Sequence, residues 1–197
     1  MNDLRVTQFG NPVLRKVSVE VDEVTPQIYE LAEAMIKSMH DENGIGLAGP
    51  QIGVNKRIIA VGVDNLDGSE PPPPGLSPGE MQLWNAQPMV LINPKIINFS
   101  EELDVLEEGC LSIPGINVDV VRPAEIELEA TVIFERGAGR VNRKIRMVFG
   151  NLLATCFQHE IDHLDGILFV DRASNEDKKM IKKSLKKLEK STLKRLR

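Results

Sequence analysis

The chain has 197 residues, of which 42% are hydrophobic and 27% charged, and its formal net charge is −5 at pH 7. A chain of this size builds one ordinary hydrophobic core, so we predict a single domain over residues 1–197. Two cysteines exclude a disulfide framework and favour a reducing compartment, which indicates a cytoplasmic protein. The first residues have neither an apolar signal core nor a transit-peptide composition, and no segment resembles a membrane span.

The first predicted element is a helix over residues 25–38, which Thr25 and Pro26 open and which carries apolar side chains at helical spacing. Five segments are predicted as strands, and they cover residues 57–63, 89–93, 116–121, 125–134 and 143–148. Because the strands precede a helix rather than alternate with helices, we predict an α+β fold. In this fold antiparallel sheets pack around a central metal-binding helix, with an N-terminal helix and a C-terminal basic amphipathic helix.

Residues 64–88 form a proline-rich insertion with four consecutive prolines at 71–74. Proline lacks an amide hydrogen and interrupts helices and strands, so we predict a long surface loop. Two interpretations remain open. The insertion has no function of its own, or Leu83 and Trp84 fold over the mouth of a substrate site as a lid.

The segment QHEIDHLDG, residues 158–166, carries the clearest chemical signal. On a helix, His159 and His163 lie one above the other and Glu160 lies beside them. Apolar residues at helical spacing precede them, and Gly166 follows as a stop signal. Two imidazoles and a carboxylate in this pattern are typical of a metal-activated hydrolase. The alternative is a surface helix whose histidines are merely solvated or hydrogen-bonded.

A catalytic metal of this type needs a third protein ligand and an open position for water. Cys156 is on the same helical face as His163 but roughly 10 Å away along the axis, so one ion cannot bind both. We interpret Cys156 as an apolar wall of the pocket. Cys110, in the segment EGCLS, becomes the candidate third ligand. Alone, it would be read as an ordinary buried cysteine.

A glycine-rich segment, GIGLAGPQIG at residues 44–53, is too irregular for a dinucleotide loop and lacks a phosphate-loop lysine. Its small residues allow an extended substrate to approach the backbone closely. Gln51 offers a side-chain amide that could donate to a developing oxyanion. Taken alone, the segment is equally an ordinary turn after a helix.

Taken in order, GIGLAGPQ, EGCLS and QHEIDHLDG resemble the three signature segments of peptide deformylases, which remove the formyl group from the initiator methionine of new bacterial polypeptides. The resemblance runs from about residue 13 to residue 172 and weakens in the insertion and the last twenty residues. It implies that Cys110, His159 and His163 are the metal ligands. It also implies that Glu160 is the general acid/base, and that the oxyanion donors are Gln51 and the backbone amide of Leu111. It also implies a pocket for the peptide and its methionine side chain, to which Ile45, Gly46, Gly109, Leu152 and Cys156 contribute.

The chain departs from the family pattern at two positions. Gly49 stands where a second alanine is common, and Thr155 stands where a bulkier aliphatic residue is often found. The second departure bears on the shape of the methionine pocket. The resemblance further implies that Asp162 pairs with Arg122 behind the metal ligands.

The resemblance implies Fe2+ as the cofactor, with Zn2+, Ni2+ or Co2+ able to occupy the site; residue types alone do not choose among them. It implies N-formylmethionyl nascent peptides as the substrate, hydrolysed to formate and a free N-terminal methionine. In this reaction Glu160 would accept a proton from an activated water and deliver it to the leaving amine. A monomer is favoured.

Residues 174–197 are predicted to form a basic amphipathic helix. From residue 178 onward there are ten lysines and arginines against one acid, Glu189, while Ile181, Leu185 and Leu188 recur at helical spacing. One interpretation is a solvated terminal helix. The other, which the resemblance also favours, is a ribosome-binding helix that contacts the phosphates of ribosomal RNA and therefore depends strongly on salt.

Two other classes compete. A HExxH metallopeptidase would share the helix motif, but Cys110 as third ligand and the two companion segments disfavour it. An RNA-binding protein with a structural zinc would need four protein ligands, and no fourth Cys or His is placed to serve, since His40 lies just before the glycine-rich segment.

Overall fold

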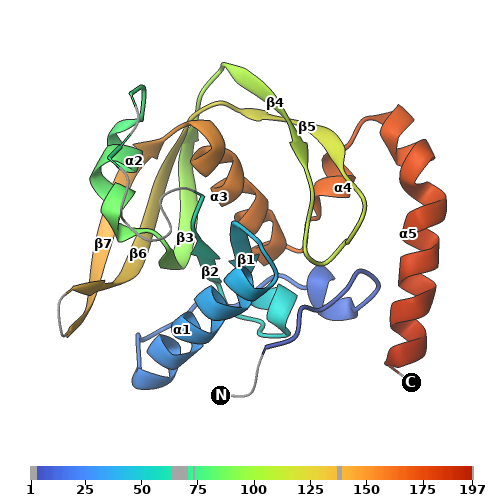
Figure 1. Ribbon diagram of the computed structural model, residues 1–197, viewed down its shortest axis with the longest axis horizontal. Coiled ribbons are helices and arrows are strands. Elements are labelled where there is room, and N and C mark those ends of the chain that lie inside the picture. The colour runs from blue at the N-terminus through green and yellow to red at the C-terminus, as the bar shows by residue number, and fades with distance from the viewer. Residues whose placement is uncertain (1–3, 64–70, 73, 137–138, 197) are drawn as a thin grey trace.

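A computed structural model describes residues 4–63, 71–72, 74–136 and 139–196 and confirms the α+β class (Figure 1). The larger sheet is antiparallel, in the order β1-β2-β3-β6-β7, and β4 and β5 form a separate two-stranded sheet. The strands are β1 (Gly46–Ala48), β2 (Ile58–Val61), β3 (Met89–Phe99), β4 (Leu103–Glu108), β5 (Val118–Pro123), β6 (Ile126–Arg136) and β7 (Gly139–Phe149).

Two helices cover opposite faces of the larger sheet. The alternating side chains of β2 and β3 explain this, because Ile59 and Leu91 pack with α3 (Asn151–Leu164), whereas Ile58 and Val90 pack with α1 (Pro26–Asp41). Both faces are therefore buried, and β2 has no polar position. The result is a three-layer core in which α3 is enclosed along most of its length.

The predicted N-terminal helix is confirmed and extends to Asp41 at its carboxyl end. Thr25 is the N-cap and Pro26 the first helical residue, where a missing amide hydrogen costs nothing. Its buried face carries Ile28, Leu31 and Met35, as the spacing predicted. The helix leads the chain directly to β1.

The insertion at residues 64–88 differs from the predicted loop in its second half. Pro78–Leu83 form the helix α2, and Trp84–Ala86 form the 3-10 helix η3. The cause is a capping box, in which Ser77 accepts from the amide of Glu80 and the Glu80 carboxylate accepts from the amide of Ser77. Residues 64–70 and 73 lie outside the described part of the chain.

The lid hypothesis is wrong. Trp84 is 4% exposed, and Leu83 belongs to the hydrophobic core that also contains Met89 and Phe149. Both side chains are therefore buried, and neither lines the cleft described below.

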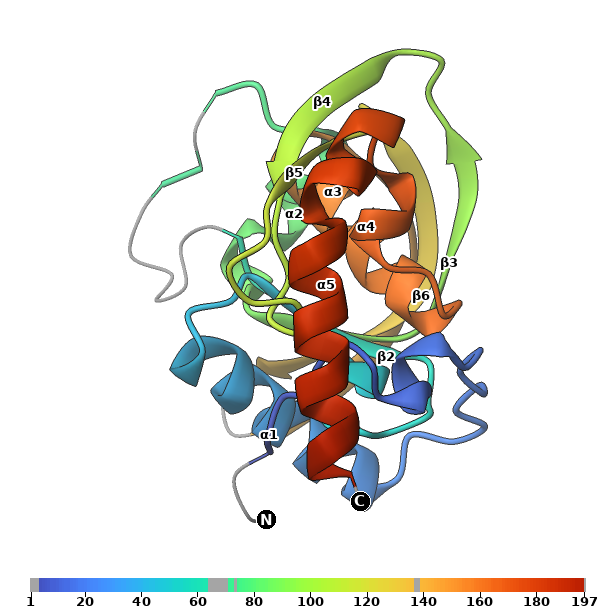
Figure 2. The ribbon, with the colours of Figure 1, turned by 90° about the vertical axis from the view of Figure 1, so that its right-hand side faces the viewer.

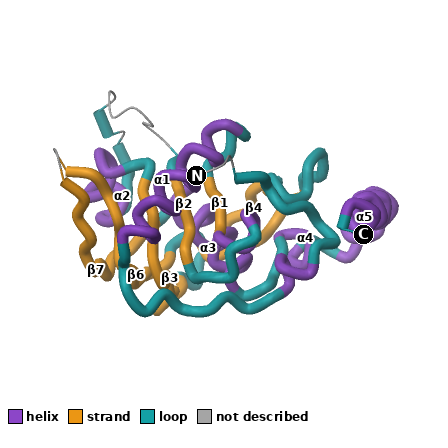
Figure 3. The backbone as a smooth tube through the Cα atoms, turned by 90° about the horizontal axis from the view of Figure 1, so that it is seen from below, coloured by secondary structure: helices purple, strands orange, loops and turns teal. Residues whose placement is uncertain are grey.

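The C-terminal basic segment is helical, as predicted, in α5 (Asn175–Arg195). Ser174 caps its first turn, and the half-buried Ile181, Leu185 and Leu188 pack on a third core. This core also takes residues from the 3-10 helix η1 (Pro12–Arg15), from β5 and from α4 (Phe169–Arg172). Figure 2 shows α5 in front, running along one side of the molecule, and Figure 3 shows it at the end opposite to β7. No described helix has the length and apolar character that a membrane crossing requires.

Candidate metal centre and active-site cleft

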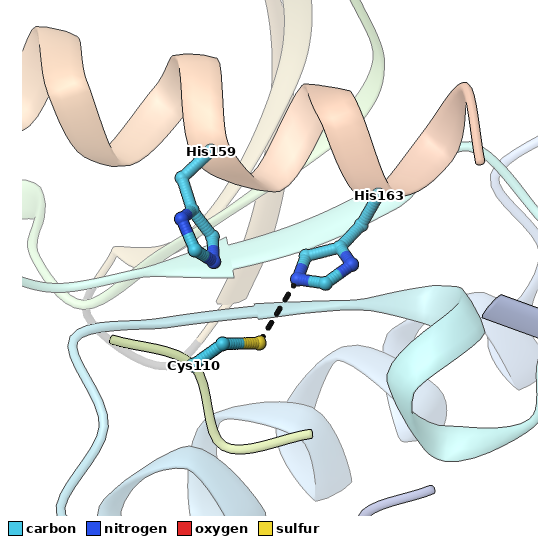
Figure 4. Close-up of side chains that lie close together, drawn as sticks. All are labelled: Cys110, His159 and His163. Atoms are coloured by element: carbon cyan, nitrogen blue, oxygen red, sulfur yellow. Dashed lines mark hydrogen bonds between the residues drawn. The ribbon is translucent and has the colours of Figure 1, made fainter. Parts of the chain in front are cut away.

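Three residues that the sequence nominated as metal ligands meet at the centre of the molecule. His159 and His163 come from α3, and Cys110 comes from the turn that follows β4 (Figure 4). One ligand atom from each lies within 4.8 Å of the others. Cys110 Sγ is 3.2 Å from His163 Nε2, and both imidazoles are buried. Such a set of soft sulfur and imidazole donors fits a divalent transition metal.

Glu108 orients His159. Its Oε2 accepts from His159 Nδ1 at 2.8 Å, so Nδ1 carries the hydrogen and Nε2 keeps its lone pair for a metal. The sequence pattern assigned no role to Glu108, the first residue of the segment EGCLS. The signal that could have found it was its position two residues before the candidate ligand Cys110.

Arg122 joins two carboxylates behind the histidines. Its Nε and Nη2 donate to the two oxygens of Glu108, and its Nη1 donates to Asp162 Oδ2 at 2.8 Å. The predicted pair of Asp162 with Arg122 is therefore present. Arg122 is buried because it occupies an inward position of β5, in register with the buried Val118 and Val120.

These contacts set the ionisation of the buried acids. Burial alone would raise the pKa of Glu108, but the hydrogen bonds from His159 and Arg122 lower it to about 2. Burial, together with the positive charge of Arg122, lowers the pKa of His163 well below its ordinary value. Glu108 is therefore ionised at neutral pH and His163 is neutral, as a metal ligand must be.

Glu160 is the acid beside the ligands. It is 3% exposed, its Oε2 has no hydrogen-bond partner, and burial raises its pKa to about 7. A buried carboxyl group with a pKa near the working pH suits proton transfer in both directions. A Cβ atom on Gly46 would lie 2.3 Å from Glu160 Oε1, so only glycine at position 46 leaves this carboxylate room.

A cleft of about 420 Å³ opens beside this centre. It is lined by all the residues that the sequence assigned to substrate and oxyanion binding, together with Glu160 and two of the three proposed ligands. These residues are Ile45, Gly46, Gln51, Gly109, Cys110, Leu111, Leu152, Cys156, His159 and Glu160. The walls are mostly apolar, and the half-exposed Ile45 and Leu152 form part of its open side.

Gln51 is held with its amide group turned toward Cys110. Its Oε1 accepts from the amide of Ala48 at 2.7 Å, and its Nε2 donates to Cys110 Sγ at 3.3 Å. The Nε2 group has a second hydrogen for a substrate. Cys156 is buried with its thiol 3.5 Å from the Ile45 carbonyl oxygen, and burial raises the pKa of this thiol well above its ordinary value. It is a wall residue rather than a ligand, as its spacing indicated.

The two departures from the family pattern have different structural settings. A Cβ atom on Gly49 would lie 2.7 Å from the Lys56 carbonyl oxygen and 2.8 Å from that of Val54, and Gly49 does not line the cleft. This glycine therefore serves local backbone packing. Thr155 does line the cleft, so its smaller and more polar side chain alters the wall itself.

A cysteine sulfur and two imidazoles that converge beside a buried carboxylic acid define the class of metal-dependent hydrolases. Within this class the chain belongs to the polypeptide deformylase family, whose family model matches residues 3–179. The enzyme hydrolyses the N-formyl group of nascent polypeptides.

Known relatives support the assignment over most of the chain. A peptide deformylase of Prochlorococcus marinus (strain AS9601) is 41% identical over 174 residues, which are 88% of this chain and 75% of the relative. One of Picosynechococcus is 43% identical over 173 residues, covering 88% and 80%. The solved structure of a Synechococcus elongatus peptide deformylase in complex with actinonin is 34% identical, with a TM-score of 0.73 and coverage of 93% and 86%.

Proposed function

We propose that Cys110, His159 and His163 bind the catalytic metal ion and leave one position open for water. The carrying observation is the convergence of their ligand atoms within 4.8 Å, beside a cleft that also holds Glu160. A metal ion bound there supplies Lewis acidity and makes water nucleophilic near neutral pH. The Glu108 hydrogen bond supports this assignment, because it presents the Nε2 lone pair of His159.

Glu160 is the proton carrier of the reaction. Its buried carboxylate accepts a proton from the attacking water and delivers it to the amine that leaves the formyl carbon. The unpartnered Oε2 is free to take up this proton. The positive charge of a bound metal ion would favour the ionised form of Glu160. This is the form that accepts the proton of the attacking water.

Gln51 and the backbone amide of Leu111 stabilise the tetrahedral oxyanion. The hydrogen bond from Ala48 to Gln51 Oε1 fixes the side chain, so its Nε2 donor is oriented before the substrate binds. Leu111 directly follows Cys110 and lines the same cleft. Losing one such donor typically costs about 2.7 to 4 kcal/mol of transition-state stabilisation.

The cleft binds the methionyl peptide. Ile45, Leu152 and Cys156 offer apolar surface for the methionine side chain. Gly46 and Gly109 keep the backbone on both sides of the cleft accessible. Because β1 pairs only with β2, its outer edge can pair with an extended peptide, as in recognition by strand addition.

The metal in the cell is ferrous iron, and zinc, nickel or cobalt can replace it. The donor set supports a transition metal rather than Mg2+ or Ca2+, which prefer oxygen ligands. Iron beside a cysteine thiolate is sensitive to oxidation. The two free cysteines agree with a reducing compartment, so we place the enzyme in the cytoplasm. We also propose that it is a monomer.

The exposed face of α5 binds the ribosome, where the substrate emerges. Its apolar face packs on the third core, while its lysines are exposed. A helix that carries cations in this way can contact RNA phosphates without disturbing the active site.

The deciding experiment measures formate release from formyl-Met-Ala-Ser by anaerobically purified, iron-loaded protein. We expect rapid release from the wild type and its near-complete loss in Glu160→Ala. Unformylated Met-Ala-Ser is the control for the metallopeptidase alternative and should stay intact. A folded, metal-loaded wild type that releases no formate would contradict the proposed roles.

A further inference from the structure

A chain of four alternating charges links the protein surface to the metal ligand His159. It consists of Arg172, Asp162, Arg122 and Glu108 in that order. Their side chains are respectively 41%, 9%, 3% and 5% exposed, so the chain begins near solvent and ends in the core. The first three are contributed by α4, α3 and β5, which are otherwise separate elements.

Arg172 has the geometry of a clamp on Asp162. Its Nε donates to Oδ2 and its Nη2 donates to Oδ1, each at 2.5 Å, so the contact uses both oxygens of the carboxylate. Asp162 Oδ2 also accepts from Arg122 Nη1. The position of this oxygen is therefore set from two sides.

The position of Asp162 decides where the donors of Arg122 point. Arg122 has a rigid planar fork, and Asp162 takes its Nη1 while Glu108 takes Nε and Nη2. If Asp162 turns, the fork turns as a unit. Glu108 Oε2 is shared between Arg122 and His159, so this movement reaches the imidazole directly.

The charge balance points the same way. The four side chains sum to zero, and removing Arg172 leaves two buried carboxylates to share one guanidinium. The network would then carry a net negative charge in the interior, which is costly, so we expect it to rearrange.

We propose that Arg172 is a positioning residue for the metal centre, acting through Asp162, Arg122 and Glu108 on the orientation of His159. Arg172 does not line the cleft, and its hydrogen bonds go to Asp162 rather than to a proposed metal ligand. This inference rests on the proposed assignment of His159 as a ligand.

The test uses the full chain loaded with Co2+, whose absorption reports the ligand geometry, and measures cobalt release to a chelator. Groups that support metal ligands indirectly typically change metal affinity or activity by 10- to 100-fold, and we expect Arg172→Gln to release cobalt about 10-fold faster with an altered spectrum. Arg172→Lys, which keeps the charge but not the fork, should lie between Arg172→Gln and the wild type.

Arg57→Gln is the matched control. Arg57 forms an ion pair with Asp165 at 2.6 Å, close to the end of the same helix α3, but this pair has no hydrogen bond to Arg122 or Glu108. We expect wild-type cobalt release and spectrum from this variant. A purely structural role of Arg172 would instead make the two variants alike.

Two further readings separate the possible outcomes. Arg172→Gln in an Asp162→Asn background should not speed cobalt release any further, because Arg172 acts through the Asp162 carboxylate and that carboxylate is already absent. Formyl-peptide turnover should fall in kcat with KM unchanged. Release by Arg172→Gln at the rate of Arg57→Gln would overturn the proposal, whereas a wild type that takes up no cobalt at Cys110 and the two histidines would overturn the proposed metal site instead.

Discussion

Glu108 makes a pH-dependent contribution to stability that can be calculated from its environment. In the metal-free protein its pKa is about 2, against an ordinary value of 4.5, because His159 and Arg122 donate to it. Each unit of pKa corresponds to about 1.4 kcal/mol, so the ionised carboxylate stabilises the fold by about 3 kcal/mol at pH 7. Because the folded-state pKa is lowered, this contribution is complete above pH 4.5 and disappears as the pH falls through about 2.

Glu108→Gln removes this titration while keeping a side chain of similar shape. The free energy of unfolding, measured with urea on metal-free protein, should be lower than that of the wild type at pH 7. The difference between the two proteins should then shrink by about 2 kcal/mol between pH 7 and pH 3, because over that range only the wild type takes up a proton at this site on unfolding. Titrating groups that do not contact Glu108 are common to both proteins and cancel.

The controls follow from the same contacts. Glu127→Gln removes an acid whose pKa Arg146 also lowers, but in an exposed ion pair, which is usually worth little. Its difference from the wild type should therefore stay small at both pH values. A difference for Glu108→Gln that is equally large at pH 7 and pH 3 would refute the reasoning, because the loss would then come from shape rather than from charge.

Three further predictions test the site and the surface. Gly46→Ala should fold but lose at least about 100-fold in kcat, since the new methyl group displaces Glu160; unchanged turnover would mean that this carboxylate is placed differently. Anaerobically prepared enzyme should be more active than aerobic enzyme of equal metal content, and equal activities would count against iron. Four exposed lysines of α5 can be replaced with glutamine, namely Lys182, Lys183, Lys186 and Lys187. This change should weaken ribosome binding at low salt and leave formyl-peptide turnover intact. Undiminished binding would show that α5 is not the ribosome-binding element.

Much of the site could be predicted because its residues sit in short, regular patterns. The spacing of His159 and His163 follows from the helix, and the need for a third ligand left Cys110 as the candidate. Apolar residues at helical spacing predicted the helix over Pro26–Asp41 and the basic helix α5. Such patterns are local, so they can be recognised in the sequence without knowledge of the fold.

Other elements gave weaker signals. The strand β4 is exposed at five of its six positions and therefore shows no alternation, and β1 has only three residues. The strand β3 continues beyond the predicted end at Asn93 because a register shift between Ile92 and Lys95 accommodates Pro94. The helix α2 was hidden by the prolines before it, although Pro78 at its first position favours a helix start.

The contacts of Arg172 and Glu108 are harder to predict, because they join residues that no local pattern relates. Glu108 meets His159 across 51 positions of sequence, and Arg122 meets Asp162 across 40. No sequence pattern named His159 as the partner of Glu108, and only the family resemblance named Asp162 as the partner of Arg122. Only the packing of the β4–β5 sheet against α3 pairs them.

The metal centre forms where α3 meets the end of β4. Residues four apart on a helix share one face, so His159 and His163 point together. Glu108 is the last residue of β4 and Cys110 lies in the turn that follows; Cys110 is a proposed ligand, and Glu108 orients the ring of His159. A Cβ atom on Gly109, between them, would lie 2.7 Å from Asn117 Oδ1, so a larger residue there would have to displace the exposed Asn117 side chain. The motif EGC therefore places the proposed ligand and the orienting acid two residues apart, on a segment that borders the cleft.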